Sequence, residues 1–325
     1  MKILVTGGAG YIGSHLVDRL LGRGDEVWVV DNLTTGNIRN IAGHLANRAF
    51  HFVNDSILNE ELMDRMIETV DTVYHLAATV GVKHVVVNPL AGVLTNVQGT
   101  EIVFKYAFKY WKRVLLASTS EIYGKTTKFP FREDDDRVLG STRVHRWSYS
   151  TSKGIDEHIA FAYSDKGLPV SIVRYFNSYG PRIDEGGYGS VVAQFIRQAL
   201  TGQPLTVHGD GLQSRCFTFV SDTIDGTLLA GERATALGTA FNVGATEETR
   251  ILDLARLILR LTDSKSEPRF ISYDEAFGKA FEDTSRRLPS MERARELLEW
   301  QPAVKLEDGL RKTIEWCREN YVQHR

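Results

Sequence analysis

The start of the chain carries a strand pattern, then closely spaced glycines, then a helical pattern. Residues 2–6 form a short apolar run, and Gly7, Gly10 and Gly13 follow it. Glycines at this spacing allow a tight turn and let the backbone approach a pyrophosphate. The helix predicted from residue 14 to 21 would direct its free N–H groups and positive dipole end at that anion. A tight strand-to-helix turn without a ligand is the alternative, but the order strand, glycines, helix is the context that a dinucleotide site requires.

Strand and helix patterns alternate over the first 177 residues, which predicts an α/β fold with a doubly wound parallel sheet, the Rossmann architecture. We expect one domain over residues 1–177, to which part of 215–245 returns, and a smaller mixed α/β domain over 178–325. The further predicted strands are 26–30, 51–55, 72–78, 114–117, 170–174 and 205–208. The further predicted helices are 58–69, 90–110, 149–166, 190–201, 221–232, 251–262, 290–298 and 306–322.

Carboxylates stand at the ends of two predicted strands. Asp31 ends the second strand, where it could accept hydrogen bonds from both ribose hydroxyls of an adenosine and would repel a 2′-phosphate. NAD is therefore favoured over NADP. Asp55 ends the third strand and is placed to meet an adenine edge, and the fourth strand ends in Leu76, Ala77 and Ala78, of which the alanines suit close packing beside a cofactor. A helix cap or turn is the other interpretation of Asp31.

The candidate reaction centre lies between residues 118 and 153. Tyr149 and Lys153 are four residues apart on a predicted helix, so they share one face. A nearby cation favours the phenolate, so we expect Lys153 to lower the pKa of Tyr149 and make it a general base. The Thr119 hydroxyl could share the same substrate oxygen. An ordinary amphipathic helix with a surface Tyr–Lys pair is the alternative.

Composition narrows the classes of partner. Lys and Arg total 39 and Asp and Glu total 41, giving a formal charge of −2, which argues against binding nucleic acid or an anionic membrane. Cys216 and Cys317 make neither a metal cluster nor a disulfide framework, so we expect no metal and a reducing, cytoplasmic location. We find no signal-peptide pattern and no run long enough to span a membrane. Arg215 is a possible phosphate ligand, with a surface salt bridge as the alternative.

Taken together, these motifs resemble the extended short-chain dehydrogenases/reductases that modify nucleotide sugars. The motifs that carry the resemblance are Thr6-Gly-x-x-Gly-x-x-Gly13, Asp31, His75-Leu-Ala-Ala78, Asn96, Tyr149-x-x-x-Lys153, Arg174-x-Phe-Asn177, Gly180-Pro-Arg182 and Gln213-x-Arg-x-Phe-x-x-Val220. The resemblance covers almost the whole chain. It implies tightly bound NAD in the first domain, a nucleoside-diphosphate sugar in the second, and transient oxidation at the sugar C4. It also implies a homodimer formed through a four-helix bundle of the helices near 90–110 and 149–166.

The resemblance implies a wider set of contacts. For NAD these are Gly7, Gly10, Tyr11, Ile12, Gly13, Asp31, Asn32, Asp55, Ser56, Leu76, Ala77, Ala78, Asn96, Tyr149, Lys153, Tyr175 and Arg182. For the nucleotide sugar they are Ser120, Glu121, Asn177, Gln194, Thr206, His208, Gln213, Arg215 and Arg287.

Within this family, several segments look like the UDP-glucuronate decarboxylases (UDP-xylose synthases). They are 117–124, 195–200, 204–207 and Arg287-Leu-Pro-Ser290, where that group has Asp in place of Ser290. By this resemblance, Glu121 and Arg287 join Thr119, Tyr149 and Lys153 as catalytic residues. Residues 79–83 depart from that group and look more like the 4-epimerases.

Four functions follow from these patterns. A β-keto acid formed by C4 oxidation of a hexuronate loses carbon dioxide readily, so we expect decarboxylation of UDP-glucuronate to UDP-xylose or UDP-4-keto-xylose. A UDP-sugar 4-epimerase acting on UDP-glucuronate or UDP-glucose comes second, since it needs only room for the 4-keto sugar to rotate. A 4,6-dehydratase is third, because many dehydratases have Asp-Glu where this chain has Ser120-Glu121. A non-catalytic NAD-binding protein on the same fold is the fourth.

Overall fold

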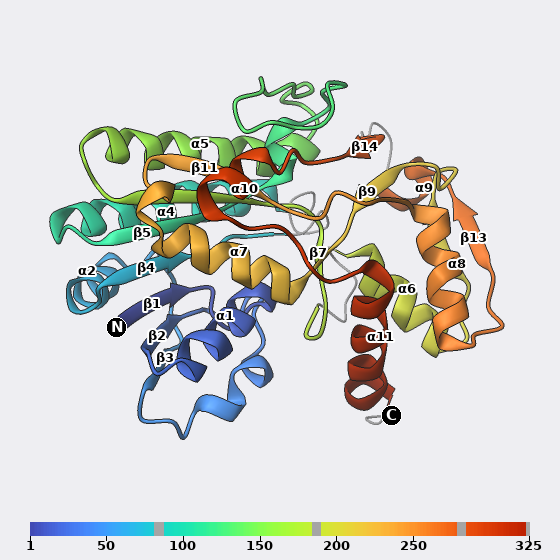
Figure 1. Cartoon of the computed structure of the whole chain (residues 1–325), viewed down its shortest axis with the longest axis horizontal. Coiled ribbons are helices and arrows are strands. Elements are labelled where there is room, and N and C mark those ends of the chain that lie inside the picture. The colour runs from blue at the N-terminus through green and yellow to red at the C-terminus, as the bar shows by residue number, and fades with distance from the viewer. Residues whose placement is uncertain (81–87, 184–189, 278–283, 323–325) are drawn as a thin grey trace.

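The computed structural model describes residues 1–80, 88–183, 190–277 and 284–322 (Figure 1). Its centre is a seven-stranded sheet in the order β11-β6-β5-β4-β1-β2-β3, with every pair parallel. The predicted Rossmann architecture is therefore confirmed. The strands are β1 (Lys2–Thr6), β2 (Glu26–Val30), β3 (Phe50–Val53), β4 (Thr72–His75), β5 (Arg113–Thr119), β6 (Val170–Tyr175) and β11 (Thr239–Val243).

Helices cover both faces of this sheet. One face packs on α1 (Tyr11–Gly22) and α7 (Val220–Glu232), and the other on α2 (Glu60–Thr69), α4 (Pro89–Lys109) and α5 (Arg146–Asp165). The central strands are buried on both faces, so Ile3, Leu4 and Val5 are all completely buried. This double burial is the reason why their sequence is a continuous apolar run and does not alternate.

Several element boundaries differ from the prediction, and three of them bear on the site. The fourth strand stops at His75, after which the Leu76 and Ala77 N–H groups bond to the Thr6 carbonyl and hydroxyl beside the glycine loop. The third strand stops at Val53, and Asp55 instead accepts hydrogen bonds from Ser56 N–H and the Asn59 amide at the start of α2. Helix α5 begins at Arg146, three residues earlier than predicted.

A second lobe is built from short elements that follow β6. Its strands pair as β8 with β13, as β9 with β12 and β14, and as β7 with β10. The strands are β7 (Ser178–Tyr179), β8 (Leu205–His208), β9 (Ser214–Cys216), β10 (Thr218–Phe219), β12 (Glu248–Arg250), β13 (Pro268–Ile271) and β14 (Arg286–Arg287). The helices are α6 (Val191–Leu200), α8 (Ile251–Thr262), α9 (Tyr273–Phe277) and α11 (Leu306–Cys317), whereas α10 (Glu292–Leu298) packs on β11 and α7 of the first lobe. The chain crosses between the lobes more than once, because α7 and β11 return to the large sheet; the expected domain division stays a prediction.

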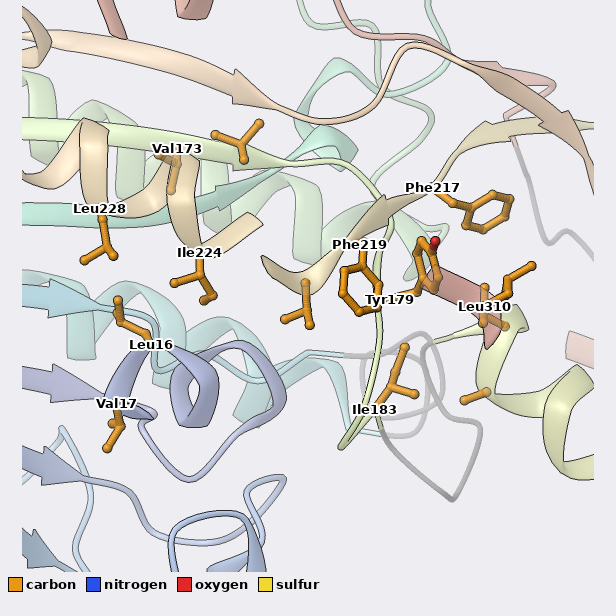
Figure 2. Packing of buried hydrophobic residues seen from close by; sticks show 14 of the residues in the cluster. Leu16, Val17, Val173, Tyr179, Ile183, Phe217, Phe219, Ile224, Leu228 and Leu310 are labelled. Carbon is orange, nitrogen blue, oxygen red and sulfur yellow. The ribbon is translucent and has the colours of Figure 1, made fainter. Parts of the chain in front are cut away.

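An aromatic cluster joins the two lobes (Figure 2). Tyr179 makes edge contacts with Phe217 and Phe219, with ring centroids 6.4 and 5.6 Å apart. Its hydroxyl donates to the Leu306 carbonyl at the start of α11 at 3.0 Å. Figure 2 shows this cluster beside the α1 and α7 side chains, so one apolar core runs from the sheet into the second lobe. No helix among the described residues is long and apolar enough to cross a membrane.

Candidate active site

The glycine loop between β1 and α1 has no room for side chains at two positions. Gly7 has a φ of +73°, and a Cβ there would lie 2.8 Å from the Ala77 Cα. A Cβ on Gly13 would lie 2.2 Å from the Gly7 carbonyl oxygen. The loop is thus pressed against the segment after β4 and against the first turn of α1.

The N-terminus of α1 is open to an anion. Gly10 caps it without a side-chain hydrogen bond, and the first turn contains no acidic residue. The free N–H groups and the positive end of the helix dipole therefore stay available. A pyrophosphate fits this arrangement, since only a backbone stripped of side chains can approach it so closely.

Asp31 lies one strand away, at the end of β2. Its two oxygens accept hydrogen bonds from Ala9 N–H and Leu33 N–H, each at 2.9 Å. Burial raises the pKa of Asp31, and these backbone bonds oppose the rise. A Cβ on Gly36 would lie 2.7 Å from its Oδ1, so the following loop also crosses close to the carboxylate. The carboxylate is held in place with lone pairs left over, which fits a ribose diol.

Several other predicted cofactor residues already have partners in the protein. Arg182 pairs with Asp18 on α1 at 2.8 Å, and the Tyr175 hydroxyl meets Thr227 at 2.9 Å. The other internal bonds join the Tyr11 hydroxyl to Ser178, Asn32 to Thr34 N–H, Ser56 to Leu58 N–H, and Ala77 N–H to Thr6. Ile12 packs against the core with Leu76, while Ala78 is partly buried. These contacts fix the residues around the glycine loop, and the cofactor roles of these residues stay predictions.

Asn96 links the cofactor side to helix α5. Its carbonyl oxygen accepts from Thr79 N–H at 2.7 Å, and its amide donates to Ser152 at 3.1 Å. Ser152 directly precedes Lys153, so Asn96 positions the helix turn that carries the lysine. In the segment 79–83, which departs from the decarboxylase pattern, Gly81, Val82 and Lys83 lie outside the described residues.

Thr119 and Tyr149 meet at the carboxyl end of β5, as the motif predicts. Their side chains share a hydrogen bond. The pKa of Tyr149 in the chain alone is raised and not lowered as expected: burial raises it most, and the charges of Glu121 and Asp156 raise it further, while the Thr119 hydrogen bond and the Arg146 charge lower it. The Lys153 ammonium instead donates to Asp156 at 2.9 Å, and both side chains are almost completely buried.

Two arginines converge on Glu121 beside Tyr149. Arg146 and Arg287 each contact one of its carboxylate oxygens, at 2.5 and 2.6 Å. Only 15% of the Glu121 side chain is exposed. Although burial disfavours the charge, the two guanidinium groups lower the pKa of Glu121 to about 2. The residue is therefore a carboxylate at neutral pH, within a cluster that carries one net positive charge.

Three contacts bring this cluster together. Ser150 on α5 donates to the Glu121 carbonyl at 2.8 Å, which ties the turn after β5 to the helix. Strand β14 pairs with β9, so that Arg287 lies opposite Arg215. Phe131 N–H bonds to the Leu288 carbonyl at 2.7 Å, which holds the Arg287 segment against the first lobe.

Most of the remaining predicted sugar-binding residues make hydrogen bonds within the second lobe and are not part of this cluster. Thr206 bonds to Gln198 at 2.8 Å, Gln213 donates to the His208 carbonyl at 2.9 Å, and Asn177 donates to the Cys216 carbonyl at 3.2 Å. Arg215 is buried and donates to the Ser214 carbonyl at 2.8 Å. Ser120 is buried, and Gln194 is partly buried on α6. Their substrate contacts stay predictions.

The sequence interpretation missed Arg146 and Asp156. Arg146 stood in a stretch taken as a loop, although its position three residues before Tyr149 places it on the same face once the helix includes it. Asp156 had a comparable signal, since it lies three residues after Lys153. Among the described residues, no group of three or more His, Cys, Asp or Glu side chains could hold a metal ion.

Comparison with known proteins agrees with this geometry. A family model described as GDP-mannose 4,6 dehydratase matches residues 4–313. The chain belongs to this family. The resemblance to the extended dehydrogenases/reductases that modify nucleotide sugars is thereby confirmed.

Relatives of known activity include two decarboxylases. The chain is 40% identical to the UDP-N-acetyl-alpha-D-glucosaminuronate decarboxylase of Bacillus cytotoxicus over 98% of both chains. It is 37% identical to the UDP-glucuronic acid decarboxylase 1 of Xenopus tropicalis, over 98% of this chain and 72% of that one.

Similar solved structures include two epimerases. UDP-glucose 4-epimerase from Thermotoga maritima, with UDP-glucose, has a TM-score of 0.89 and 34% identity, over 98% of this chain and 99% of that one. UDP-glucuronic acid 4-epimerase from Bacillus cereus, in complex with UDP-glucuronic acid and NAD, has a TM-score of 0.88 and 29% identity, over 99% and 100%.

Proposed function

We propose that the protein is an NAD-dependent decarboxylase of a UDP-linked hexuronate. The candidates for the sugar are UDP-glucuronate, with UDP-xylose or UDP-4-keto-xylose as product, and its 2-acetamido analogue. The observation that carries the proposal is the pair of arginines, Arg146 and Arg287, that meet on Glu121 beside Tyr149. The decarboxylase relatives support the reaction class.

NAD is the cofactor of this chain, and the glycine loop, the open end of α1 and Asp31 are the groups that would hold it. When bound, it would accept the hydride that leaves C4 of the sugar, and its positive charge would favour the Tyr149 phenolate over the phenol. The chain itself positions the sugar and moves the proton. The Tyr149 phenolate takes the proton of the C4 hydroxyl, and Thr119 shares a hydrogen bond with Tyr149 and orients the same oxygen.

The arginine pair suits the next step. A guanidinium binds a carboxylate through two parallel N–H groups, so Arg146 and Arg287 can hold the C6 carboxylate while the C5–C6 bond breaks and carbon dioxide leaves. The electron pair of that bond passes to the C4 carbonyl as an enolate, and C5 then gains a proton from solvent. With a pKa of about 2, Glu121 is ionised and has no proton to give, so we assign it the task of orienting the two guanidinium groups.

Product analysis tests the proposal. The purified protein is incubated with NAD and, separately, with UDP-glucuronate, its 2-acetamido analogue and UDP-glucose, and products are read by mass spectrometry. We expect loss of carbon dioxide from one or both uronates, and no product from Tyr149→Phe. An unchanged mass with inversion at C4 would establish the epimerase alternative, and loss of water from UDP-glucose would establish a dehydratase.

We also propose a homodimer through a four-helix bundle of α4 and α5. The two helices pack side by side on one face of the sheet, and Leu90, Leu94 and Ile155 are exposed on them. Light scattering during gel filtration would give twice the chain mass. Leu94→Lys should then shift the protein to a monomer, and a wild-type monomer at micromolar concentration would contradict the proposal.

A further inference from the structure

Lys153 and Asp156 form an ion pair that the reaction scheme above does not use. Their side chains are 3% and 0% exposed, and Lys153 Nζ lies 2.9 Å from Asp156 Oδ2. Both residues belong to α5, three positions apart. Burying two charges costs free energy unless each is held by further polar contacts, so such a pair inside an active site calls for a reason.

A set of polar side chains lies between this pair and the glycine loop. His75 on β4 lies between Thr6 and Thr100, with Nδ1 2.8 Å from the Thr6 hydroxyl and Nε2 3.0 Å from the Thr100 hydroxyl. The Thr6 hydroxyl also accepts from Ala77 N–H at 3.2 Å. Thr100 lies close enough to Asp156 to lower the pKa of that carboxyl, although among the described residues the Asp156 Oδ1 atom is buried without a hydrogen-bond partner at normal distance.

The protonation state of His75 determines which atoms donate and which accept in these hydrogen bonds. Burial, and then the charge of Lys153, lower the pKa of His75 to about 3, so the ring is neutral at neutral pH. Because the Thr6 oxygen accepts from Ala77, its own hydrogen can go to Nδ1, which leaves the Nε2 hydrogen for Thr100. A buried series of side chains therefore runs from the glycine loop through β4 and α4 to Asp156 and Lys153.

We propose that Asp156 is a positioning residue, which anchors the Lys153 ammonium to this buried series and whose negative charge limits how strongly that ammonium favours the Tyr149 phenolate. The inference rests on membership of the family and on Tyr149 as the base. It holds equally for a decarboxylase and for an epimerase.

Electrostatics give the sign of the effect. Asp156 raises the pKa of Tyr149, so removing its charge should lower that pKa. The other charged or titratable groups around this part of the site are Glu121 on the turn after β5, Arg146 and Glu157 on α5, His75 on β4, and Arg287 against Glu121. All of these groups are still present in a variant that is substituted only at Asp156.

The test titrates Tyr149 directly. In the NAD complex, the ultraviolet band of tyrosinate is followed against pH for wild type and Asp156→Asn, and the same titration of Tyr149→Phe and Asp156→Asn/Tyr149→Phe identifies the Tyr149 signal. We expect the midpoint to fall by about one pH unit, a tenfold change in proton affinity. Asp165→Asn makes the same chemical change at the exposed end of α5 and should leave the midpoint in place. A midpoint that stays or rises in Asp156→Asn would overturn the proposal.

A comparison of Lys153→Met with the double variant keeps the proposal testable if Asp156→Asn alone does not fold. Lys153→Met with Asp156→Asn removes both charges and avoids leaving one of them unpaired. If Asp156 acts through Lys153, the double variant and Lys153→Met have the same residual turnover, whichever sugar the enzyme accepts. A further tenfold loss in the double variant would show an independent role for Asp156 and would contradict the inference.

Discussion

Two buried carboxylates flank Tyr149, and they differ in their preferred protonation state. Glu121 contacts two guanidinium groups, and its pKa is lowered to about 2. Asp156 contacts one ammonium, and burial raises its pKa in spite of that cation. One opposite charge does not outweigh the complete burial of Asp156, whereas two outweigh the partial burial of Glu121. The comparison also explains why the sequence pattern misjudged Tyr149, which senses both carboxylates as well as its own burial.

The largest effect should come from Tyr149, the group between the two carboxylates. Tyr149→Phe removes the acid/base oxygen and keeps the ring, so we expect turnover to fall about 1,000-fold. NAD should stay bound, as measured by its absorbance in the purified protein. Near-normal turnover would show that another group is the base.

Glu121→Gln should cost the most stability of the single changes to the carboxylates. It leaves two buried guanidinium groups without a counter-charge, for which about 3 kcal/mol of unfolding free energy is expected. Urea unfolding measures the loss. Glu61→Gln breaks an exposed pair with Arg65 on α2 and serves as the matched control, with less than about 0.5 kcal/mol. If both variants lost the same small amount of unfolding free energy, Glu121 would not be the counter-charge of two buried guanidinium groups.

The pH dependence of stability should have opposite signs for the two carboxylates. Because the folded-state pKa of Glu121 is lowered from 4.5 to about 2, its contribution is complete above pH 4.5 and is lost as the pH falls toward 2. The pKa of Asp156 is raised above 3.8, so the folded state holds its proton longer and stability falls as the pH rises from 3.8 through the folded-state value.

Urea unfolding over a pH series sharpens this contrast. Relative to wild type, Glu121→Gln should flatten the loss of stability below pH 4.5. Asp156→Asn should remove a decline that begins above pH 3.8. If the pH dependence of the unfolding free energy changed with the same sign in both variants, the predicted difference between the two carboxylates would be wrong.

The smallest effect should follow from Arg146→Lys. The charge beside Glu121 remains, but the planar fork that matches a carboxylate is lost. We expect a rise in KM for the uronate of about fivefold, equivalent to about 1 kcal/mol, with little change in unfolding free energy. Steady-state kinetics of carbon dioxide release measure it, and Arg143→Lys, at an exposed position nearby, is the control.

Sequence patterns were most reliable where one segment contains the whole interaction. The glycine loop and the alternation of strands and helices in the first lobe could be predicted because steric limits and hydrophobic periodicity act over a few residues. The start of α5 was misplaced, since Arg146 follows a charged, turn-rich stretch and has no side-chain cap to mark the helix. Arg287 was assigned through family resemblance alone, because nothing in its own neighbourhood indicates what it contacts.

By itself, the sequence determined the glycine loop and the spacing of Tyr149 and Lys153, because those features depend on backbone geometry within one or two turns. Only the tertiary structure decided which charges meet. Arg287 reaches Glu121 through the pairing of β14 with β9, and the Lys153–Asp156 pair, although local to one helix, is buried only because α5 packs against the rest of the chain. Protonation depends on burial and on neighbouring charges, and both are fixed only when distant segments pack together.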